Sequence, residues 1–307
     1  MHELTQGLLL VDKHAGCTSH DVVVQARRLL KTRKIGHCGT LDPDATGLLL
    51  LTVGRATRLT RFLIKAPKVY EGTIRFGIST DTYDTSGTIV SERPTDDLCD
   101  RTIGRAMDAF LGTYEQTPPP YCAKKIGGVK YYELARRGEA TPDAKKPVSI
   151  YTYQPLAGYQ PGVDLPFRLS CASGTYARSL AHELGERLGT GAVLASLRRT
   201  QISTLYNVEQ AATIATLRQR MEEGEVLGSA WLPFDEIPLP FSEVIADAQQ
   251  ERRIGNGQTV LVHAIEGQEG DWVKLIDSRH RFLAVGAVVE RIGAGGVGVV
   301  QPKVVFR

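Results

Sequence analysis

Hydrophobic residues near the start of the chain come in short unbroken runs. Gly7–Val11 and Leu48–Val53 are such runs, and runs of this kind are typical of strands that are covered on both faces. Between them, Thr18 or Ser19 can cap a helix that extends to about Thr32. The first fifty residues therefore predict a buried strand, a helix and a second buried strand.

Further strands and helices alternate up to about residue 230. Gly36–Gly47 contains three glycines and a proline and is expected to be a loop, and Asp81–Gly87 has the composition of a turn. Strands are predicted over Val69–Ile78, Val148–Gln154, Phe167–Ala172 and Leu194–Ile202, and helices over Ala56–Ile64, Asp97–Phe110, Tyr131–Arg137, Tyr176–Leu188 and Val208–Glu222. This order predicts an α+β fold with a mixed, mostly antiparallel central sheet and flanking helices.

The character of the chain changes after a proline-rich linker at Leu232–Pro240. Beyond it, glycines separate short predicted strands, at Thr259–Ala264, Trp272–Ile276, Phe282–Val288 and Val297–Val300. This pattern predicts a small C-terminal β-barrel. We therefore expect two domains, residues 1–236 and 239–307.

The composition is that of a globular protein, with 42% hydrophobic and 23% charged residues. The longest apolar runs are far too short to span a bilayer, and the N-terminus lacks the pattern of a signal peptide. The five cysteines are scattered, odd in number and without a CxxC pair, which fits a reducing compartment. We expect a soluble, cytoplasmic protein with no membrane partner.

Positive charge is concentrated between Val22 and Tyr70. This window holds ten basic and only two acidic residues, whereas the rest of the chain holds 27 basic and 32 acidic ones. A local cationic field on a nearly neutral protein suits a polyanion such as RNA. A solvated basic surface without a partner is an equally good interpretation of the charge alone.

One carboxylate stands out in that window. Asp42 lies in a segment with glycines at 36, 39 and 47, and Pro43 fixes the backbone directly after it. An acid surrounded by cations stays ionised, as a nucleophile or general base must. An Asx-turn or helix cap would explain the same residue equally well.

A resemblance decides between these interpretations. The core of the loop reads Gly-Thr-Leu-Asp-Pro-Asp-Ala-Thr-Gly, and Gly-Arg-Ala-Thr follows at 54–57. Further motifs are Lys68-Val-Tyr70, Thr80-Asp-Thr, Gln116-Thr-Pro-Pro-Pro-Tyr121, Cys171-Ala-Ser-Gly-Thr-Tyr-Ala-Arg-Ser-Leu180 and Leu197-Arg-Arg-Thr200. In this order they resemble the bacterial tRNA pseudouridine-55 synthases, the TruB family, over nearly the whole of the first 200 residues.

The resemblance implies roles for particular residues. Asp42 matches the catalytic aspartate of pseudouridine synthases, Tyr70 the tyrosine that stacks on the target base and is implicated in proton removal, and Arg178 the arginine that pairs with the carboxylate. Substrate-binding roles are implied for His37, Gly39, Thr40, Lys68, Tyr176 and Leu197. Contacts to the RNA backbone are expected from Arg55, Arg58, Lys125 and Arg136.

Two features of the sequence leave open points. Asp44 stands where the family commonly has an apolar residue, so it could compete for Arg178. His14, Cys17 and His20 have a spacing that suggests zinc, but three ligands this close together make a poor site, and we expect no metal.

The resemblance further implies the reaction and its partners. Uridine in the T loop of tRNA would be flipped out and isomerised without a cofactor, because the reaction involves no redox change. The C-terminal domain resembles, more weakly, a PUA RNA-binding domain and would hold the acceptor-stem side of the tRNA. We expect a monomer that needs no protein partner. The alternatives are a guide-dependent relative within an RNA–protein complex, a tRNA-folding chaperone and a general RNA-binding protein.

Overall fold

The computed structural model describes residues 4–120, 125–126, 129–130, 145–263, 265–293 and 296–306. Its main body is a ten-stranded sheet in the order β14-β1-β3-β12-β4-β11-β10-β7, with β2 beside β3 and β13 beside β12. The strands are β1 (Gly7–Lys13), β2 (Ile35–His37), β3 (Thr46–Val53), β4 (Lys68–Phe76), β7 (Gly112–Gln116), β10 (Lys146–Pro155), β11 (Leu165–Cys171), β12 (Ala192–Ile202), β13 (Tyr206–Asn207) and β14 (Trp231–Pro233). Among the described residues every pairing in this sheet is antiparallel except that of β3 with β12. The predicted fold class is confirmed.

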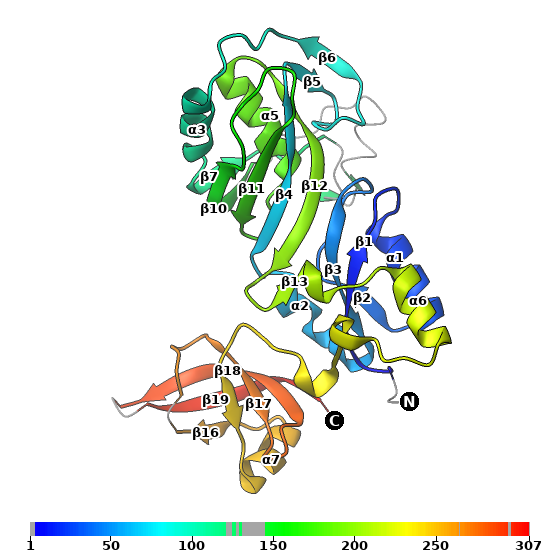
Figure 1. Ribbon diagram of the computed structural model, residues 1–307. Coiled ribbons are helices and arrows are strands. Elements are labelled where there is room, and N and C mark those ends of the chain that lie inside the picture. The colour runs from blue at the N-terminus through cyan, green and yellow to red at the C-terminus, as the bar shows by residue number, and fades with distance from the viewer. Residues whose placement is uncertain are drawn as a thin grey trace.

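Helices and short turns complete the main body. The helices are α1 (Ser19–Leu29), α2 (Thr60–Leu63), α3 (Asp100–Asp108), α5 (Ala177–Leu188) and α6 (Ile214–Glu222). Short 3-10 turns are η1 (Gly54–Leu59), η2 (Val208–Gln210), η3 (Gly228–Ala230) and η4 (Phe234–Glu236), and two hairpins are formed by β5 (Ile78–Thr80) with β6 (Ile89–Glu92) and by β8 (Lys125–Ile126) with β9 (Val129–Lys130). In Figure 1, α3 and α5 lie beside β4, β10 and β11, whereas α1 and α6 lie beside β1 and β3.

The unbroken hydrophobic runs are explained by burial on both faces of β1 and β3. Leu49 and Leu51 join a core with residues of α1 and α6, such as Val22 and Leu217. Leu48 and Leu50 point the other way, into a core that also contains aromatic residues of the C-terminal region. A strand buried on both sides has no solvent face, so it shows no polar alternation.

The C-terminal region forms a curled five-stranded half-barrel in the order β15-β17-β18-β19-β16. Its elements are β15 (Glu243–Ile245), α7 (Ala248–Gly255), β16 (Val260–Val262), β17 (Trp272–Ile276), β18 (Phe282–Ile292) and β19 (Val297–Val305). This sheet lies below the main body in Figure 1 and packs against it through apolar contacts. Phe62 of α2 makes edge-on ring contacts to Phe241 and Trp272, with centroids 5.7 and 4.9 Å apart. Such an apolar seam fixes the two sheets relative to each other.

Several predicted boundaries were wrong. Ile35–His37 is a strand rather than part of a loop, because its backbone pairs with β3. The single helix predicted over Val208–Glu222 is broken into η2 and α6. The break occurs because the backbone of Ala212 hydrogen-bonds to Asp12 and Leu10 of β1 (3.0 and 3.3 Å) instead of to its own helix. The helix predicted over Tyr131–Arg137 lies outside the described residues.

Candidate active site

The loop between β2 and β3, residues 38–45, carries Asp42. Ala45 donates a backbone hydrogen bond to the Asp42 carbonyl (3.1 Å), which closes a turn around Pro43. Ser19 at the start of α1 accepts from the Leu41 amide (2.9 Å) and donates to the Leu41 carbonyl (3.2 Å). The Asp42 side chain is nevertheless 44% exposed. The backbone is thus held from below while the carboxylate stays open to an incoming molecule.

A buried lysine holds the same loop from the β1 side. The Lys13 ammonium donates to the carbonyls of His14 (3.0 Å), Pro43 (2.8 Å) and Ala45 (2.6 Å). Burial lowers the pKa of Lys13, and the carboxylates of Asp44 and Asp42 partly oppose this. Lys13 therefore fixes the turn and adds positive charge close to Asp42.

Arg178, in the first turn of α5, pairs with Asp42 through two nitrogens. Its Nε lies 2.9 Å from Asp42 Oδ2, and its Nη2 donates to Oδ1 at 3.1 Å. The guanidinium is buried and also donates to the Thr82 carbonyl (3.2 Å) and lies 3.5 Å from Asp84 Oδ2. A two-point pair of this kind sets the orientation of the carboxylate as well as its charge.

Asp84 is a member of this network that the sequence did not single out. It lies in the turn between β5 and β6, where its Oδ1 accepts from the Thr82 hydroxyl (2.6 Å) and the Ser86 amide (3.0 Å). Asp44, by contrast, is exposed, and the ion pairs that Arg178 forms in the described part of the chain are with Asp42 and Asp84. The carboxylate that shares Arg178 with Asp42 is therefore Asp84.

Tyr70 and Leu197 lie on adjacent strands of the sheet, β4 and β12. Both are half-buried and pack on the core that α3 and α5 form with the sheet. Burial raises the pKa of Tyr70, the nearby Asp42 carboxylate raises it further, and the Arg199 guanidinium beside the phenol opposes the rise. Tyr70 is thus close enough to Asp42 for the two groups to act on one substrate.

Tyr176 directly precedes α5 and is fixed by a buried glutamine. The amide group of Gln116 donates to the Tyr176 carbonyl (3.1 Å) and accepts from the Tyr176 backbone N–H (2.8 Å). The same side chain donates to the Tyr114 hydroxyl (2.7 Å). This two-way bond ties the end of β7 to the start of α5 and so positions both Tyr176 and Arg178.

The other predicted substrate-binding residues surround the Asp42 loop. His37 ends β2, and its buried Nδ1 has no hydrogen-bond partner in the described part of the chain. Burial and the Arg199 charge lower the pKa of His37, which favours a neutral ring. Gly39 has φ of +109°, a conformation that only glycine adopts readily, and Thr40 is exposed.

Lys68 is placed differently from the others, because its ammonium points into the protein. It donates to the carbonyls of Ile64 and Ala66, each at 2.6 Å. Burial, reinforced by the charge of Arg199, lowers the pKa of Lys68 to about 8. In this structure Lys68 therefore holds the end of α2 beside the loop rather than reaching into open space.

The residues expected to bind the RNA backbone do not form one surface. Arg55 donates to Gln6 and lies 5.1 Å above the ring of Phe234. Arg58 donates to the Val305 carbonyl and lies over the Phe306 ring. Lys125 begins β8, and Arg136 lies outside the described residues. Arg55 and Arg58 thus both contact the C-terminal part of the chain.

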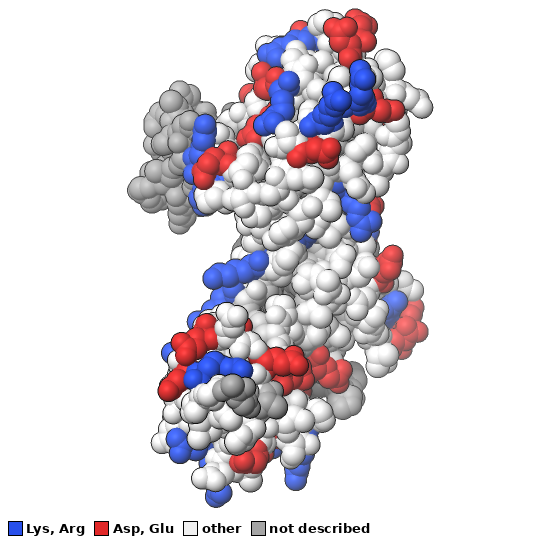
Figure 2. Space-filling model, turned by 90° about the vertical axis from the view of Figure 1, so that its left-hand side faces the viewer, with Lys and Arg blue, Asp and Glu red and all other residues white. Residues whose placement is uncertain are grey.

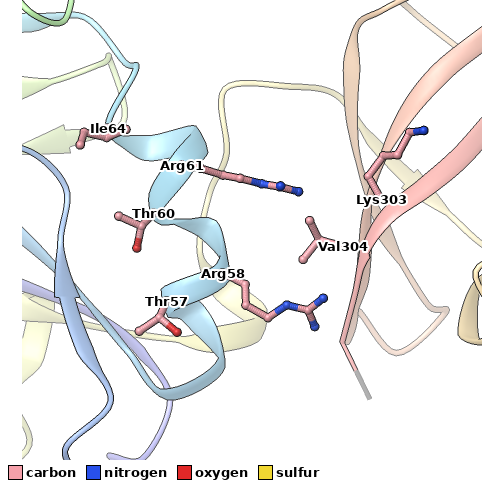
Figure 3. Close-up of a pocket in the computed structure, with 7 residues that line it drawn as sticks. All are labelled: Thr57, Arg58, Thr60, Arg61, Ile64, Lys303 and Val304. Atoms are coloured by element: carbon pink, nitrogen blue, oxygen red, sulfur yellow. The ribbon is translucent and has the colours of Figure 1, made fainter. Parts of the chain in front are cut away.

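A cleft opens between η1–α2 and β19, with a volume of about 510 Å³. Figure 3 shows Arg58 and Arg61 extending from η1 and α2 toward β19, which carries Lys303 and Val304. A second hollow of about 350 Å³ is lined by Arg61, Phe62, Lys65, Phe241 and Trp272. Arg61 lines both hollows, so together they form a seam that is lined by cations and aromatic rings.

The distribution of surface charge supports this placement of the cationic window. On the face shown in Figure 2, acidic and basic side chains mix at both ends of the molecule, and the middle is largely uncharged. The excess positive charge of residues 22–70 is therefore not spread over that face. Part of it lines the seam, and part of it, Lys68, is buried.

Comparisons with known proteins identify the family. Residues 27–177 match the TruB family pseudouridylate synthase N-terminal domain, 178–237 the tRNA pseudouridylate synthase B C-terminal domain, and 242–306 the pseudouridine synthase II TruB C-terminal domain. The chain is 39% identical to tRNA pseudouridine synthase B of Thermobifida fusca (99% of each chain) and 38% identical to that of Solibacter usitatus (92% of this chain, 96% of the relative).

Solved structures share the fold. An H/ACA RNP bound to a substrate RNA containing 2′-deoxyuridine matches with a TM-score of 0.74 at 23% identity, covering 99% of this chain and 86% of that one. A Cbf5-Nop10-Gar1 complex matches with a TM-score of 0.73 at 24% identity, covering 98% and 85%. The fold, the Asp42–Arg178 pair and these relatives define a pseudouridine synthase. The chain belongs to the TruB family.

The described residues contain no group of three or more His, Cys, Asp or Glu side chains that could hold a metal ion, and none of their helices is long and apolar enough to cross a membrane. His14 and Cys17 do approach each other, with Nε2 and Sγ 3.8 Å apart.

Proposed function

We propose that this enzyme isomerises uridine in the T loop of tRNA to pseudouridine, with Asp42 as its essential carboxylate. The observation that carries the proposal is the two-point pair between Asp42 and Arg178, which leaves an oriented carboxylate open to solvent. The curated relatives, named tRNA pseudouridine synthase B, match over nearly the whole chain and supply the substrate class.

The reaction exchanges one bond for another. The N1–C1′ bond of uridine breaks, the uracil turns, C5 bonds to C1′, the proton on C5 leaves and N1 gains a proton. No electron or group is supplied from outside, so no cofactor is needed. Asp42 can attack C1′, add to C6 or remove the 2′ proton, and each route requires the ionised carboxylate. Arg178 keeps it in that form and in one orientation.

The target base must leave its loop to reach Asp42. Flipping costs on the order of a few kcal/mol, which stacking and phosphate contacts can offset. Tyr70 is placed to stack on the extracted base and take part in proton removal, with Tyr176 and Leu197 as neighbouring walls. His37, kept neutral by its surroundings, suits the space beside the everted nucleotide.

The seam between the main sheet and the half-barrel is the second region that would touch tRNA. Arg58, Arg61 and Lys303 line it from both sides, and Arg58 is already anchored on the half-barrel. We propose residues 1–236 as the catalytic domain and 239–307 as a PUA-like domain that holds the acceptor-stem side of the tRNA. Arg55, Lys125 and Arg136 remain further proposed RNA contacts.

We propose a stand-alone, cytoplasmic monomer, because nothing in the geometry of Asp42, Arg178 and Tyr70 requires a second protein. The guide-dependent alternative has one observation in its favour, namely that the two structures of the same fold are RNA–protein or protein complexes. Activity on naked T-arm RNA with no added protein separates the two. A chaperone without catalytic activity would have no use for the oriented carboxylate.

Asp42→Asn tests the proposal, with Asp44→Asn as the matched control two residues away on the exposed side of the loop. Each variant is incubated with an unmodified tRNA transcript, and pseudouridine is mapped by position. We expect Asp42→Asn to form no product while its affinity for tRNA stays within about threefold of wild type, and Asp44→Asn to remain active. Product formation by Asp42→Asn, or wild-type product outside the T loop, would refute the proposal.

A further inference from the structure

Arg199 is a fully buried cation at the centre of the main sheet. Its side chain is 1% exposed and is the largest of the fully buried side chains. Its Nε donates to the Leu48 carbonyl (2.7 Å) and its Nη2 to the Gly39 carbonyl (3.1 Å). The ion pairs that the described residues form with one another do not include Arg199. A buried guanidinium held by neutral carbonyls keeps its full positive field.

The position of Arg199 on β12 places it between the two catalytic elements. In the sheet register, Arg199 faces Gly47 of β3 on one side and Tyr70 of β4 on the other. The Gly39 carbonyl that it binds belongs to the loop that carries Asp42. One side chain therefore touches the loop of the carboxylate and the strand of the tyrosine.

The contact to Tyr70 is made at its hydroxyl. The guanidinium forms a side-chain hydrogen bond with the phenol and lowers its pKa, against the larger effect of burial, which raises it. Because an arginine has only N–H groups, it donates and the phenol oxygen accepts. The bond fixes where that oxygen lies and favours negative charge on it.

We infer that Arg199 is a positioning residue for Tyr70. Its planar fork ties the phenol oxygen to the Gly39 and Leu48 carbonyls, so the tyrosine and the Asp42 loop keep one separation. When Tyr70 helps to remove the proton from the turning uracil, the guanidinium stabilises the charge that develops on the phenol oxygen. This role rests on the proposed function, because it acts through Tyr70 in that reaction.

The competing explanation is that Arg199 only satisfies the buried carbonyls of Leu48 and Gly39. Such a structural role would change the free energy of unfolding, and its loss would reduce activity by the same factor with or without Tyr70. A positioning role predicts instead that the effects of changing Arg199 and Tyr70 are strongly coupled.

The test is a double-mutant cycle with Arg199→Lys and Tyr70→Phe, measured in single turnover on a T-arm RNA. Lysine keeps the buried charge but cannot make the fork. We expect Arg199→Lys to lower the rate about 100-fold in wild type, less than about threefold in the Tyr70→Phe background, and to change RNA affinity less than about threefold. Its alkaline rate limb should move to higher pH.

Arg198 provides the matched control on the same strand. Its guanidinium points away from Tyr70 and pairs with Asp12 through contacts of 3.0 and 2.8 Å. Any effect of Arg198→Lys should therefore be the same in both backgrounds. An Arg199→Lys effect that is equally large in both backgrounds, or a wild-type rate for that variant, would overturn the inference.

A second measurement does not depend on the stability of any Arg199 variant. In Tyr70→Phe, NMR signals of the Arg199 guanidinium protons should shift while those of Arg198 stay in place, and unchanged Arg199 signals would overturn the proposed contact. If wild-type enzyme forms no pseudouridine in tRNA although the NMR contact is present, the proposed function fails and the contact stands.

Discussion

Arg178 holds Asp42 by matching one edge of its guanidinium to both carboxylate oxygens, Nε to Oδ2 at 2.9 Å and Nη2 to Oδ1 at 3.1 Å. The pair is asymmetric in exposure, because the arginine side chain is 8% exposed and the aspartate 44%. A buried cation thus aims an accessible anion. Since the arginine is itself held by Thr82 and Asp84, the direction of the carboxylate is set by the turn after β5 as well as by its own loop.

Arg178→Lys tests whether orientation matters beyond charge. Lysine keeps a positive charge but offers a single nitrogen, so the carboxylate can rotate. We expect the single-turnover rate to fall about 100-fold, equivalent to roughly 3 kcal/mol of barrier, with RNA affinity unchanged within about threefold. A variant with a rate within about threefold of wild type would show that charge alone is sufficient.

Lys68 should make the stability of the protein depend on pH. Its pKa is lowered from 10.5 to about 8 in the folded protein, so the unfolded chain binds more protons between these values. Burying the charged amine therefore costs stability below about pH 8, and this cost is relieved as pH rises toward 10.5. Across that window the change is on the order of 3 kcal/mol.

The measurement is the urea midpoint of wild type and Lys68→Met at pH 7 and pH 9. The difference between the two proteins should shift with pH in favour of wild type, whose buried amine loses its charge, whereas methionine has no charge to lose. A difference that is the same at both pH values would mean that Lys68 titrates in its ordinary range.

Gly47→Ala should destabilise the junction of β3 with β12. Gly47 has φ of +98°, and an added Cβ would lie 2.3 Å from the Arg199 carbonyl oxygen. Because both atoms belong to backbones in the middle of the sheet, neither can move cheaply. We expect a loss of about 3 kcal/mol in the free energy of unfolding.

Gly16→Ala is the control for the backbone conformation alone. Gly16 has φ of +80°, but an added Cβ would meet nothing within 4 Å. It should lose only about 1 kcal/mol. Equal losses in chemical denaturation of the two variants would contradict the close approach of β12 to Gly47.

Lys303→Glu tests the cleft between η1–α2 and β19. If the cleft holds tRNA phosphates, this variant should bind full-length tRNA about tenfold more weakly in low salt, and the slope of log affinity against log salt should decrease by about 0.9 for each phosphate that is no longer neutralised. Turnover of an isolated T arm should change little. The full chain is needed, because deletion of the half-barrel would expose the aromatic residues that Phe62 contacts.

Arg105→Glu provides the same change of charge on α3, at the opposite end of the molecule in Figure 1. It should bind tRNA like wild type. Equal weakening by both variants would indicate a general effect of net charge and would argue against a site at the cleft.

The positions of the central strands were predictable because their signal is local. Leu48–Val53 lies in a run with no polar interruption, and Thr18 begins α1 with a capping box that the sequence already contains. The break after Gln210 was not predictable, because it depends on a pairing of Ala212 with β1, some 200 residues earlier in the chain. Backbone pairing across the fold overrides a local helical pattern.

The sequence by itself determined the fold class, the family and the candidate carboxylate Asp42, because motifs and hydrophobic runs are properties of neighbouring residues. Only the tertiary structure decided which of two adjacent arginines is buried, since side chains on a strand alternate between its faces and the identity of the inner face depends on the strands beside it. It likewise decided that Asp84 rather than Asp44 shares Arg178 with Asp42, because charge pairs form between groups that folding brings within a few ångströms, whatever their separation in sequence.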